Sequence, residues 1–295
     1  MPCPGSLPNP IHSYIASLRP TVPPSTPHSP SFFDPPSESS SPLSPIVARA
    51  KSFIHELLPP WAENHVYRTY AFGLVAADFA RWSHSKPDEE HGAEKLGWDK
   101  ELWFLTAILH DIGWDAEGNL GKDSRLSFEI YGGVKAREFL LGWGANQEVA
   151  DEVCESIIRH TVTISTSLYP FLLFIPRDQD SAPTIAGSVR LMCALTQVSP
   201  LGVIAPQDLP NYIHKLGALH DLVGVGIPTG WLHPTDNLTI CERWPRVGIA
   251  QHCPDFIDKE LGQKPGCLSY KWGGETLRQK MKDVECFKGL EGISS

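Results

Sequence analysis

A His-Asp pair at the end of a strongly apolar segment constrains this chain of 295 residues more than any other feature. His110 and Asp111 directly follow the run LWFLTAIL, which predicts a buried helix that starts at Asp99 as N-cap and stops before Gly113. A buried histidine beside an aspartate is costly unless both side chains have partners. A divalent metal binds imidazole and carboxylate together, and a helix end lets neighbouring side chains reach one ion. The alternative interpretation is a His-Asp pair that caps the helix.

The sequence after residue 45 is typical of an all-α protein. Apolar residues recur at helical spacing, and we find no strand-helix alternation, GxGxxG motif, phosphate-binding loop or internal repeat. We expect Asn64 and Asn146 to be N-caps, and Pro59-Pro60 to end the first helix. The predicted helices cover 46–58, 64–82, 99–111, 126–141 and 146–160, followed by shorter ones at 211–222, 236–244, 254–261 and 275–285.

Two segments depart from this helical pattern. Residues 1–45 hold 13 of the 27 prolines among many serines, and we expect them to form a disordered tail. Residues 161–210 carry β-branched, Ser and Pro residues without a sustained period. A long segment of this kind is unusual inside a compact domain.

Charge and cysteine content exclude several classes of protein. The net charge of −9 argues against a basic nucleic-acid surface, and no apolar run reaches about 18 residues, as a membrane span requires. The seven cysteines form no CxxC pair, which argues against a thiolate zinc site and a disulfide framework. We therefore expect a cytoplasmic protein, with the nucleus as alternative. Its partner would be a small-molecule substrate, and a homo-oligomer is left open.

Two further histidines lie on apolar helical faces. His65 opens the predicted helix 64–82, and His160 continues the stripe of Val149, Val153 and Ile157. Each histidine alone is more simply explained as a core residue. Together with His110 and Asp111, they indicate one shared site.

The strings around these residues resemble the HD-domain superfamily and, more closely, its cyanamide hydratase-like branch, familiar from fungi. The resemblance covers roughly 46–162 and 216–270. The His-Asp pair is specific only for the superfamily, whereas SFEIYGG and IIRHT narrow it to the branch. The matching strings are NHVYRTYAFG (64–73), AILHDIGW (107–114), SFEIYGG (127–133), ESIIRHT (155–161), LHPTDNLTICERWPR (232–246) and DFIDKELGQKPGC (255–267).

The resemblance implies a helical bundle around one metal ion held by two histidines and two aspartates. His65, His110 and Asp111 match the first three positions. For the last aspartate, the string ALHDLVG offers Asp221, and LTQVSPLG offers Ser199. We choose Asp221, because serine is a poor metal ligand. The HD domain then spans 46–290 with an atypical insertion at about 163–215, which is either translated intron sequence or a lineage-specific loop.

The resemblance also implies an enzyme, a metal-dependent hydro-lyase that hydrates a small nitrile such as cyanamide to urea. Two histidines and two aspartates suit zinc, with iron(II) as alternative, and such an ion acidifies water. Asp111 would be both ligand and base, and His160 would orient the substrate or relay a proton. Trp114, Phe128 and Tyr131 are candidates for an aromatic pocket wall, with core packing as the other interpretation.

Two other functions compete with this one. An HD-type metal-dependent phosphohydrolase would need a basic cradle for its phosphates, and only Lys122 and Arg125 follow the His-Asp pair closely. An inactive HD-fold protein, with its site disrupted by the insertion, would serve as a scaffold. Retention of the metal separates this third hypothesis from the other two.

Overall fold

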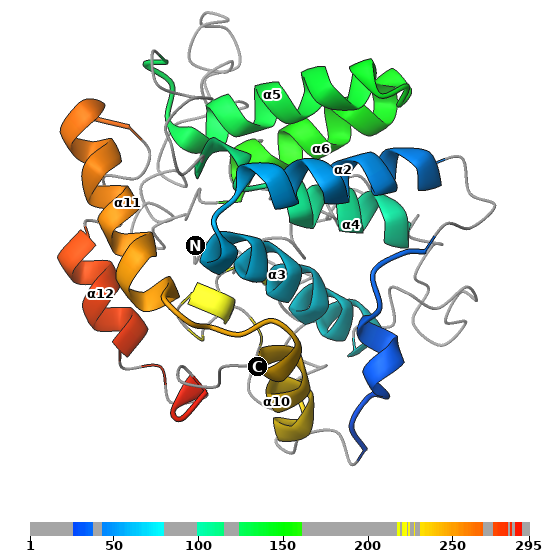
Figure 1. Ribbon diagram of the computed structural model, residues 1–295, viewed down its shortest axis with the longest axis vertical. Helices are drawn as coiled ribbons and strands as arrows, with labels where there is room; N and C mark the ends of the chain where they lie inside the picture. The colour runs from blue at the N-terminus through cyan, green and yellow to red at the C-terminus, as the bar shows by residue number, and fades with distance from the viewer. Residues whose placement is uncertain are drawn as a thin grey trace, which may run out of the picture.

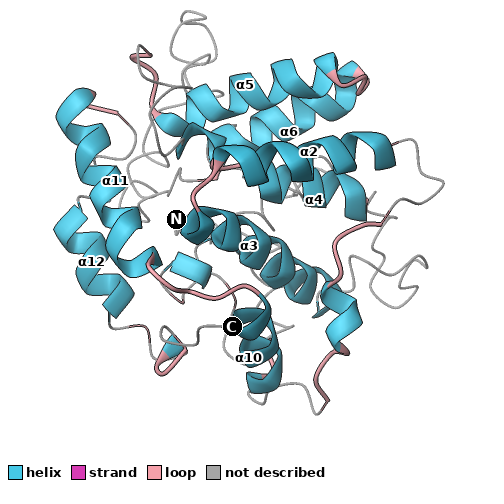
Figure 2. Ribbon diagram, in the orientation of Figure 1, coloured by secondary structure: helices cyan, strands magenta, loops and turns pink. Residues whose placement is uncertain are grey.

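The computed structural model describes residues 26–37, 43–79, 99–114, 124–160, 231–267, 274–282 and 287–290, and the positions 217, 218, 220–222, 224, 227 and 284. Every regular element within these ranges is helical, which confirms the all-α prediction (Figure 2). The expected insertion at about 163–215 lies outside the described residues. None of the described helices is long and apolar enough to cross a membrane.

Helix α3 lies at the centre of the arrangement, with α2, α4, α5 and α6 on one side and α10, α11 and α12 on the other (Figure 1). It contacts α2, α4, α10 and α11, and α5 packs along α6. The bounds are η1 Pro30–Phe33, α2 Ser44–Leu57, α3 Pro60–Phe79, α4 Lys100–Leu109, η2 Ile112–Trp114, α5 Phe128–Gly142, α6 Gln147–Arg159, α10 Pro234–Arg243, α11 Ile249–Gln263 and α12 Gly274–Lys282.

Helix α4 is buried on all sides and delivers the His-Asp pair to the interior. The Asp99 carboxylate caps it by accepting the backbone N–H groups of Glu101 at 2.8 Å and Leu102 at 3.1 Å, as the sequence predicts. All residues from 101 to 109 are buried. A helix that is apolar on every face needs a surrounding core. His110 is its C-cap, so the pair lies where the chain leaves the helix inside that core.

Helix α3 begins one turn earlier than predicted. The sequence places an N-cap at Asn64, but the helix starts at Pro60, and the Pro59 carbonyl accepts the N–H groups of Ala62 and Glu63 at 2.9 Å each. Proline suits the first helical position because its fixed φ is already helical and its missing N–H would have no partner there. Pro59-Pro60 therefore ends α2 and also starts α3, which places His65 in the second turn.

Part of the expected disordered tail packs against the helices. Residues 26–37, here called the N-terminal strap, include η1 and bury Phe33 completely. The Tyr70 hydroxyl donates to the Asp34 carbonyl at 3.1 Å, and Arg243 pairs with the Asp34 carboxylate at 2.7 Å. The Pro-rich composition hides this segment, whose two adjacent phenylalanines pack on the core. Residues 1–25 and 38–42 lie outside the description.

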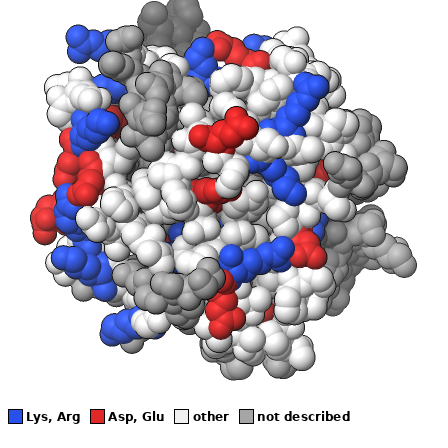
Figure 3. All heavy atoms as spheres, viewed as in Figure 1, with Lys and Arg blue, Asp and Glu red and all other residues white. Residues whose placement is uncertain are grey.

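Acidic and basic side chains are interspersed over the face shown in Figure 3. Ion pairs between such side chains link α11 to α12, where Arg278 contacts Asp255 at 2.6 Å and Asp258 at 2.7 Å. Exposed pairs of this type contribute little stability. On this face the described side chains form no extended field of one sign.

Candidate metal centre

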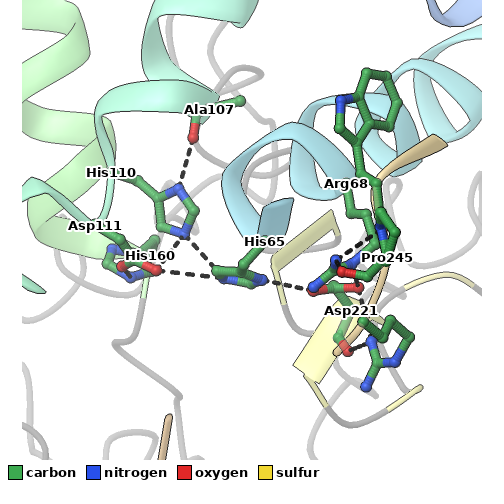
Figure 4. Close-up of polar contacts among 10 residues, drawn as sticks. His65, Arg68, Ala107, His110, Asp111, His160, Asp221 and Pro245 are labelled. Carbon is green, nitrogen blue, oxygen red and sulfur yellow. Dashed lines mark hydrogen bonds and ion pairs between the residues drawn. The ribbon is translucent and has the colours of Figure 1, made fainter. Parts of the chain in front are cut away.

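Four predicted site residues converge where α3, α4 and α6 meet (Figure 4). His65 comes from α3, His110 is the C-cap of α4, Asp111 follows it, and His160 is the C-cap of α6. His65, His110 and Asp111 are fully buried, and His160 is 5% exposed. The helix ends thus bring residues far apart in the sequence to one interior point.

The side chains of His65, His110 and Asp111 form a group that could hold a metal ion. The two Nε2 atoms of His65 and His110 lie 3.3 Å apart. The Asp111 Oδ2 atom lies 3.1 Å from Nε2 of His110 and 3.3 Å from Nε2 of His65. With metal–ligand bonds of about 2.1 Å, neighbouring ligand atoms are about 3.0 Å apart in an octahedron and about 3.4 Å apart in a tetrahedron. All three distances fall between these values.

The Asp111 carboxylate provides a second test of whether these residues suit a metal ion. Both of its oxygens are buried, and neither accepts a hydrogen bond from any residue that the structure describes. Its contacts are with the histidine rings, including Nε2 of His160 at 3.7 Å from Oδ1. A buried carboxylate without hydrogen-bond donors is costly unless a cation compensates its charge. The residues present therefore fit a divalent ion.

The three histidines are held with their Nε2 atoms facing the same point. Nδ1 of His110 lies 2.7 Å from the Ala107 carbonyl, and Nδ1 of His160 lies 2.6 Å from the Ile157 carbonyl. A carbonyl can only accept, so both Nδ1 atoms carry a proton and donate it. This leaves the Nε2 lone pairs for a metal or a substrate, the usual arrangement for metal-binding histidines.

The surroundings of the centre set its protonation states. Burial alone would raise the pKa of Asp111, but His110 and His65 hold this pKa well below its usual range. Burial alone would lower the pKa of His65, but the contacts with Asp111 and Asp221 raise it. Burial, together with repulsion from His110, lowers the pKa of His160 to about 4. Asp111 is therefore ionised and His160 neutral at pH 7.

The structure does not bring Asp221, the predicted fourth ligand, to this group. It lies on the opposite edge of the His65 ring, with Oδ2 at 2.6 Å from Nδ1 (Figure 4). Arg68 donates to it through Nε at 2.7 Å and through a terminal nitrogen at 3.0 Å, and Arg246 donates at 2.8 Å. Burial alone would raise the pKa of Asp221, but the two arginines hold it well below its usual range. The carboxylate is already fully engaged in orienting His65.

Sequence reasoning missed the two arginines that hold Asp221. Arg68 and Arg246 are 0% and 1% exposed. Arg68 also donates to the carbonyls of Trp244 at 2.9 Å and Pro245 at 2.7 Å, which ties α3 to the chain after α10. The available signal was an arginine three residues after His65 in an otherwise apolar string, because this spacing places both on one helix face.

A cavity of about 30 Å³ adjoins the centre. Trp114 and Phe128, two of the three aromatic candidates, line it and also belong to the buried core, whereas Tyr131 is not part of its described lining. Lys122 lies outside the described residues, and Arg125 is exposed. No lysine or arginine is among the described residues that line the cavity: His65, His110, Asp111, Trp114, Phe128, His160, Ala218, Leu222, Cys253, Ile257 and Leu277.

Comparison with curated proteins finds two relatives from the yeast Saccharomyces cerevisiae, cyanamide hydratase DDI2 and cyanamide hydratase DDI3. Each is 43% identical to this chain over 100 residues, which is 33% of this chain and 37% of the yeast protein. The match thus spans little more than a third of the length of these relatives. No family model matches the chain.

Proposed function

We propose that this protein is a metal-dependent hydro-lyase that adds water to a small nitrile, with cyanamide as substrate and urea as product. The observation that carries the proposal is the buried group of His65, His110 and Asp111, whose carboxylate has no hydrogen-bond donor among the described residues. The likeness to two yeast cyanamide hydratases supports the choice of reaction. Zinc is the proposed ion, with iron(II) as alternative.

The size and polarity of the cavity agree with such a substrate. One water molecule needs about 10–15 Å³ of cavity volume. The cavity of about 30 Å³ therefore has room for a molecule of a few heavy atoms. Cyanamide is linear and neutral and has three heavy atoms. Apart from the centre itself, the described lining consists of aliphatic and aromatic side chains and one cysteine. A small uncharged molecule can enter these surroundings without leaving a charge unpaired.

Each residue has a distinct role in the proposed reaction. His65, His110 and Asp111 hold the ion, which supplies Lewis acidity and lowers the pKa of water when it is bound. Asp221 fixes the ring of His65 through Nδ1. His160 is neutral, and its Nε2 faces the centre, so it can accept a proton from water and pass it to the substrate nitrogen. Water oxygen bonds to the nitrile carbon, and both water hydrogens end in urea.

The phosphohydrolase alternative has less support. Phosphate groups are commonly bound by arginine or lysine side chains. The described lining of the cavity contains neither, and the two buried arginines nearby are engaged with Asp221. Hydrolysis of a phosphate ester without hydration of cyanamide would reverse this ranking.

The test begins with the metal content of the 295-residue chain, measured by elemental mass spectrometry. We expect about one zinc or iron ion per chain and formation of urea from cyanamide. His110→Ala and Asp111→Ala should lose the metal, because each removes one of three ligands. Full metal occupancy in either variant would refute the proposed ligand set. Folded wild-type protein without metal would favour the inactive scaffold.

The variant His160→Ala separates proton transfer from metal binding. It should retain the ion and lose a factor of about 10²–10⁴ in kcat, the usual contribution of a positioned acid or base. A suitable control is His252→Ala, an exposed histidine on α11 that is absent from the described cavity lining. Loss of the ion in His160→Ala would make His160 a ligand.

A further inference from the structure

Phe128 is the first residue of α5 and forms part of the cavity wall. Its ring centroid lies 5.8 Å from that of His160 and 5.2 Å from that of Trp114. The residue is 2% exposed, so it is packed from all sides. The position of this ring therefore sets how much room the cavity offers beside His160.

The backbone N–H of Phe128 donates to a carboxylate on a different helix. The acceptor is Oε1 of Glu260 on α11, at 2.6 Å. The first N–H groups of a helix have no partner within the helix, and the side chain of the N-cap residue commonly accepts one of them. Ser127 is the N-cap of α5, but its side chain makes no capping hydrogen bond. Glu260 therefore caps α5 from a position 132 residues further along the chain.

Glu260 is itself held in place beside the cavity. It is 3% exposed, and Nζ of Lys264, one turn later on α11, lies 3.6 Å from the same Oε1 atom. Ile257 and Cys253, which line the cavity, precede Glu260 by three and seven positions and so lie on the same helix face. The face of α11 that lines the cavity thus also carries the carboxylate that holds the start of α5.

The backbone of Phe128 also packs directly against the chain that follows the His-Asp pair. A Cβ added to Gly113, the middle residue of η2, would be 2.4 Å from the Phe128 carbonyl oxygen. No side chain fits between these two backbones, so η2 blocks any shift of Phe128 towards it. The hydrogen bond to Glu260 resists a shift away from α11. Two contacts of different kinds therefore fix the residue that carries this part of the wall.

We infer that Glu260 is a positioning residue that holds Phe128 in the cavity wall and thereby limits the substrate to a very short molecule. The inference rests on the proposed function and deepens it by naming what controls substrate size. Hydrogen bonds to a charged acceptor are strong, and a buried N–H that loses its acceptor is costly. Without the carboxylate, the start of α5 gains freedom, and the Phe128 ring leaves room for a longer ligand.

The first test compares kcat/KM for cyanamide and for N-methylcyanamide, which is longer by one carbon. An extra carbon changes kcat/KM by about 10–200-fold in a closed pocket, so the wild type should prefer cyanamide at least about tenfold. Glu260→Met keeps the length of the side chain and removes the acceptor. It should reduce this preference at least about threefold with unchanged metal content. Glu260→Gln retains an acceptor oxygen and should keep the preference. Wild-type preference in Glu260→Met overturns the inference.

Glu101→Met is the matched control for general destabilisation. Glu101 is also a buried glutamate that accepts a hydrogen bond from another helix, from the Ser44 hydroxyl at 3.1 Å. It lies nine residues before His110 on α4, about 14 Å along the helix axis. This variant should lower stability and leave the preference for cyanamide unchanged. An equal loss of preference in both variants overturns the inference, because destabilisation alone would then widen the cavity.

A double variant tests whether Glu260 acts through Phe128. Phe128→Leu shrinks the wall directly and should lower the preference for cyanamide. Adding Glu260→Met to it should cause no further loss, because residues that act as one unit are not additive. Losses that simply add would mean that Glu260 acts elsewhere, and the inference would fail.

The second measurement follows binding and does not depend on turnover. The ring resonances of Phe128 are followed by NMR while acetonitrile or butyronitrile is added to the wild type and to Glu260→Met. Acetonitrile should cause saturable shifts in both proteins, and butyronitrile only in the variant. If Glu260→Met does not fold, Glu260→Asp, which withdraws the acceptor by one carbon, replaces it in both tests.

The two measurements separate the inference from the proposed function. If the wild type hydrates cyanamide and the variant still excludes butyronitrile, the inference fails and the proposed function stands. If the wild type does not hydrate cyanamide but only the variant admits butyronitrile, the proposed function fails and the control of ligand size by Glu260 stands.

Discussion

Asp221 shows how the role of a single residue depends on which edge of a ring it reaches. The sequence identifies a carboxylate at a suitable place, and the structure puts it 2.6 Å from Nδ1 of His65 rather than beside Nε2. Its oxygens also accept hydrogen bonds from Arg68 and Arg246. A carboxylate behind a metal-binding histidine orients the ring and raises its basicity. Asp221 is therefore placed to orient the ring of His65.

We expect Asp221→Asn to weaken metal binding without abolishing it. Metal affinity should fall by about 10–100-fold, the usual effect of losing a partner behind a ligand. Stability should fall by about 3–5 kcal/mol, because Arg68 and Arg246 would lose their buried counter-charge. Metal titration and chemical denaturation of the same samples measure both effects. Loss of the ion at wild-type stability would show instead that Asp221 is a ligand.

Asp236→Asn is the matched control for this variant. Asp236 is also fully buried, but it pairs with His28 of the N-terminal strap, and that histidine also contacts Asp78 on α3. Asp78 lies 13 residues beyond His65 on the same helix, about 20 Å along its axis. This variant should lower stability and leave metal affinity unchanged. A similar loss of affinity in both variants would mean that general destabilisation causes the effect.

Single-residue predictions succeed where local pattern carries the information. His65, His110 and Asp111 lie on or end apolar helical faces, so the helical period predicts that they are buried. The helical period does not predict which ring nitrogen of a histidine faces which neighbouring residue. The pairing of Asp221 with His65 joins residues 156 positions apart, and no local signal reports it. The pairing of Arg246 with Asp221, 25 positions apart, likewise has no local signal.

At the scale of helices, the pairing of α5 with α6 positions His160. Gly133 lies on the face of α5 that packs against α6, and an added Cβ would be 2.7 Å from the Ile158 side chain and 2.9 Å from the Cys154 carbonyl oxygen. Both neighbours belong to α6, whose C-cap is His160. A glycine inside a helix usually destabilises it relative to alanine. The structure shows that Gly133 permits close helix packing.

Gly133→Ala should therefore destabilise the protein by about 1–3 kcal/mol, because the backbone of α6 must move. Gly142→Ala, in the same helix, is the control, since nothing lies within 4 Å of its added Cβ. It should be neutral or stabilising by up to about 1 kcal/mol. Chemical denaturation compares the two variants. Equal effects would mean that helix propensity, rather than the contact with α6, explains the result.

Helix starts show what capping signals can and cannot predict. Asp99 and Asn146 cap α4 and α6 as expected, the latter by accepting the Val149 N–H at 2.8 Å. At the start of α3, the capping preference predicts Asn64, whereas Pro60 is the first helical residue. Both residue types favour helix starts, and only the path of the chain after α2 decides between them. Helix α11 likewise begins at Ile249, five residues before its predicted start at Pro254.

At the scale of the whole molecule, the N-terminal strap connects distant parts of the chain. Backbone N–H and ring Nδ1 of His28 each lie 2.8 Å from an Asp236 carboxylate oxygen, and Nε2 lies 3.3 Å from Asp78. The contact joins residues 208 positions apart and links the strap to α10 and α3. Composition alone predicts that the strap is disordered. A high proline content cannot reveal that a carboxylate 208 residues away will bind it.

The strap should make the stability of the molecule depend on pH. Hydrogen bonds with Asp236 and then Asp78 raise the pKa of His28 from 6.5 to about 9. A raised folded-state pKa means that the stabilisation is complete below about pH 6.5 and is lost as pH rises through about 9. We expect the free energy of unfolding of the wild type to exceed that of His28→Gln by roughly 2 kcal/mol at pH 6. This difference should shrink towards pH 10. Chemical denaturation of both proteins across this range measures the difference, and a gap that stays constant with pH would show that His28 holds the strap without its charge.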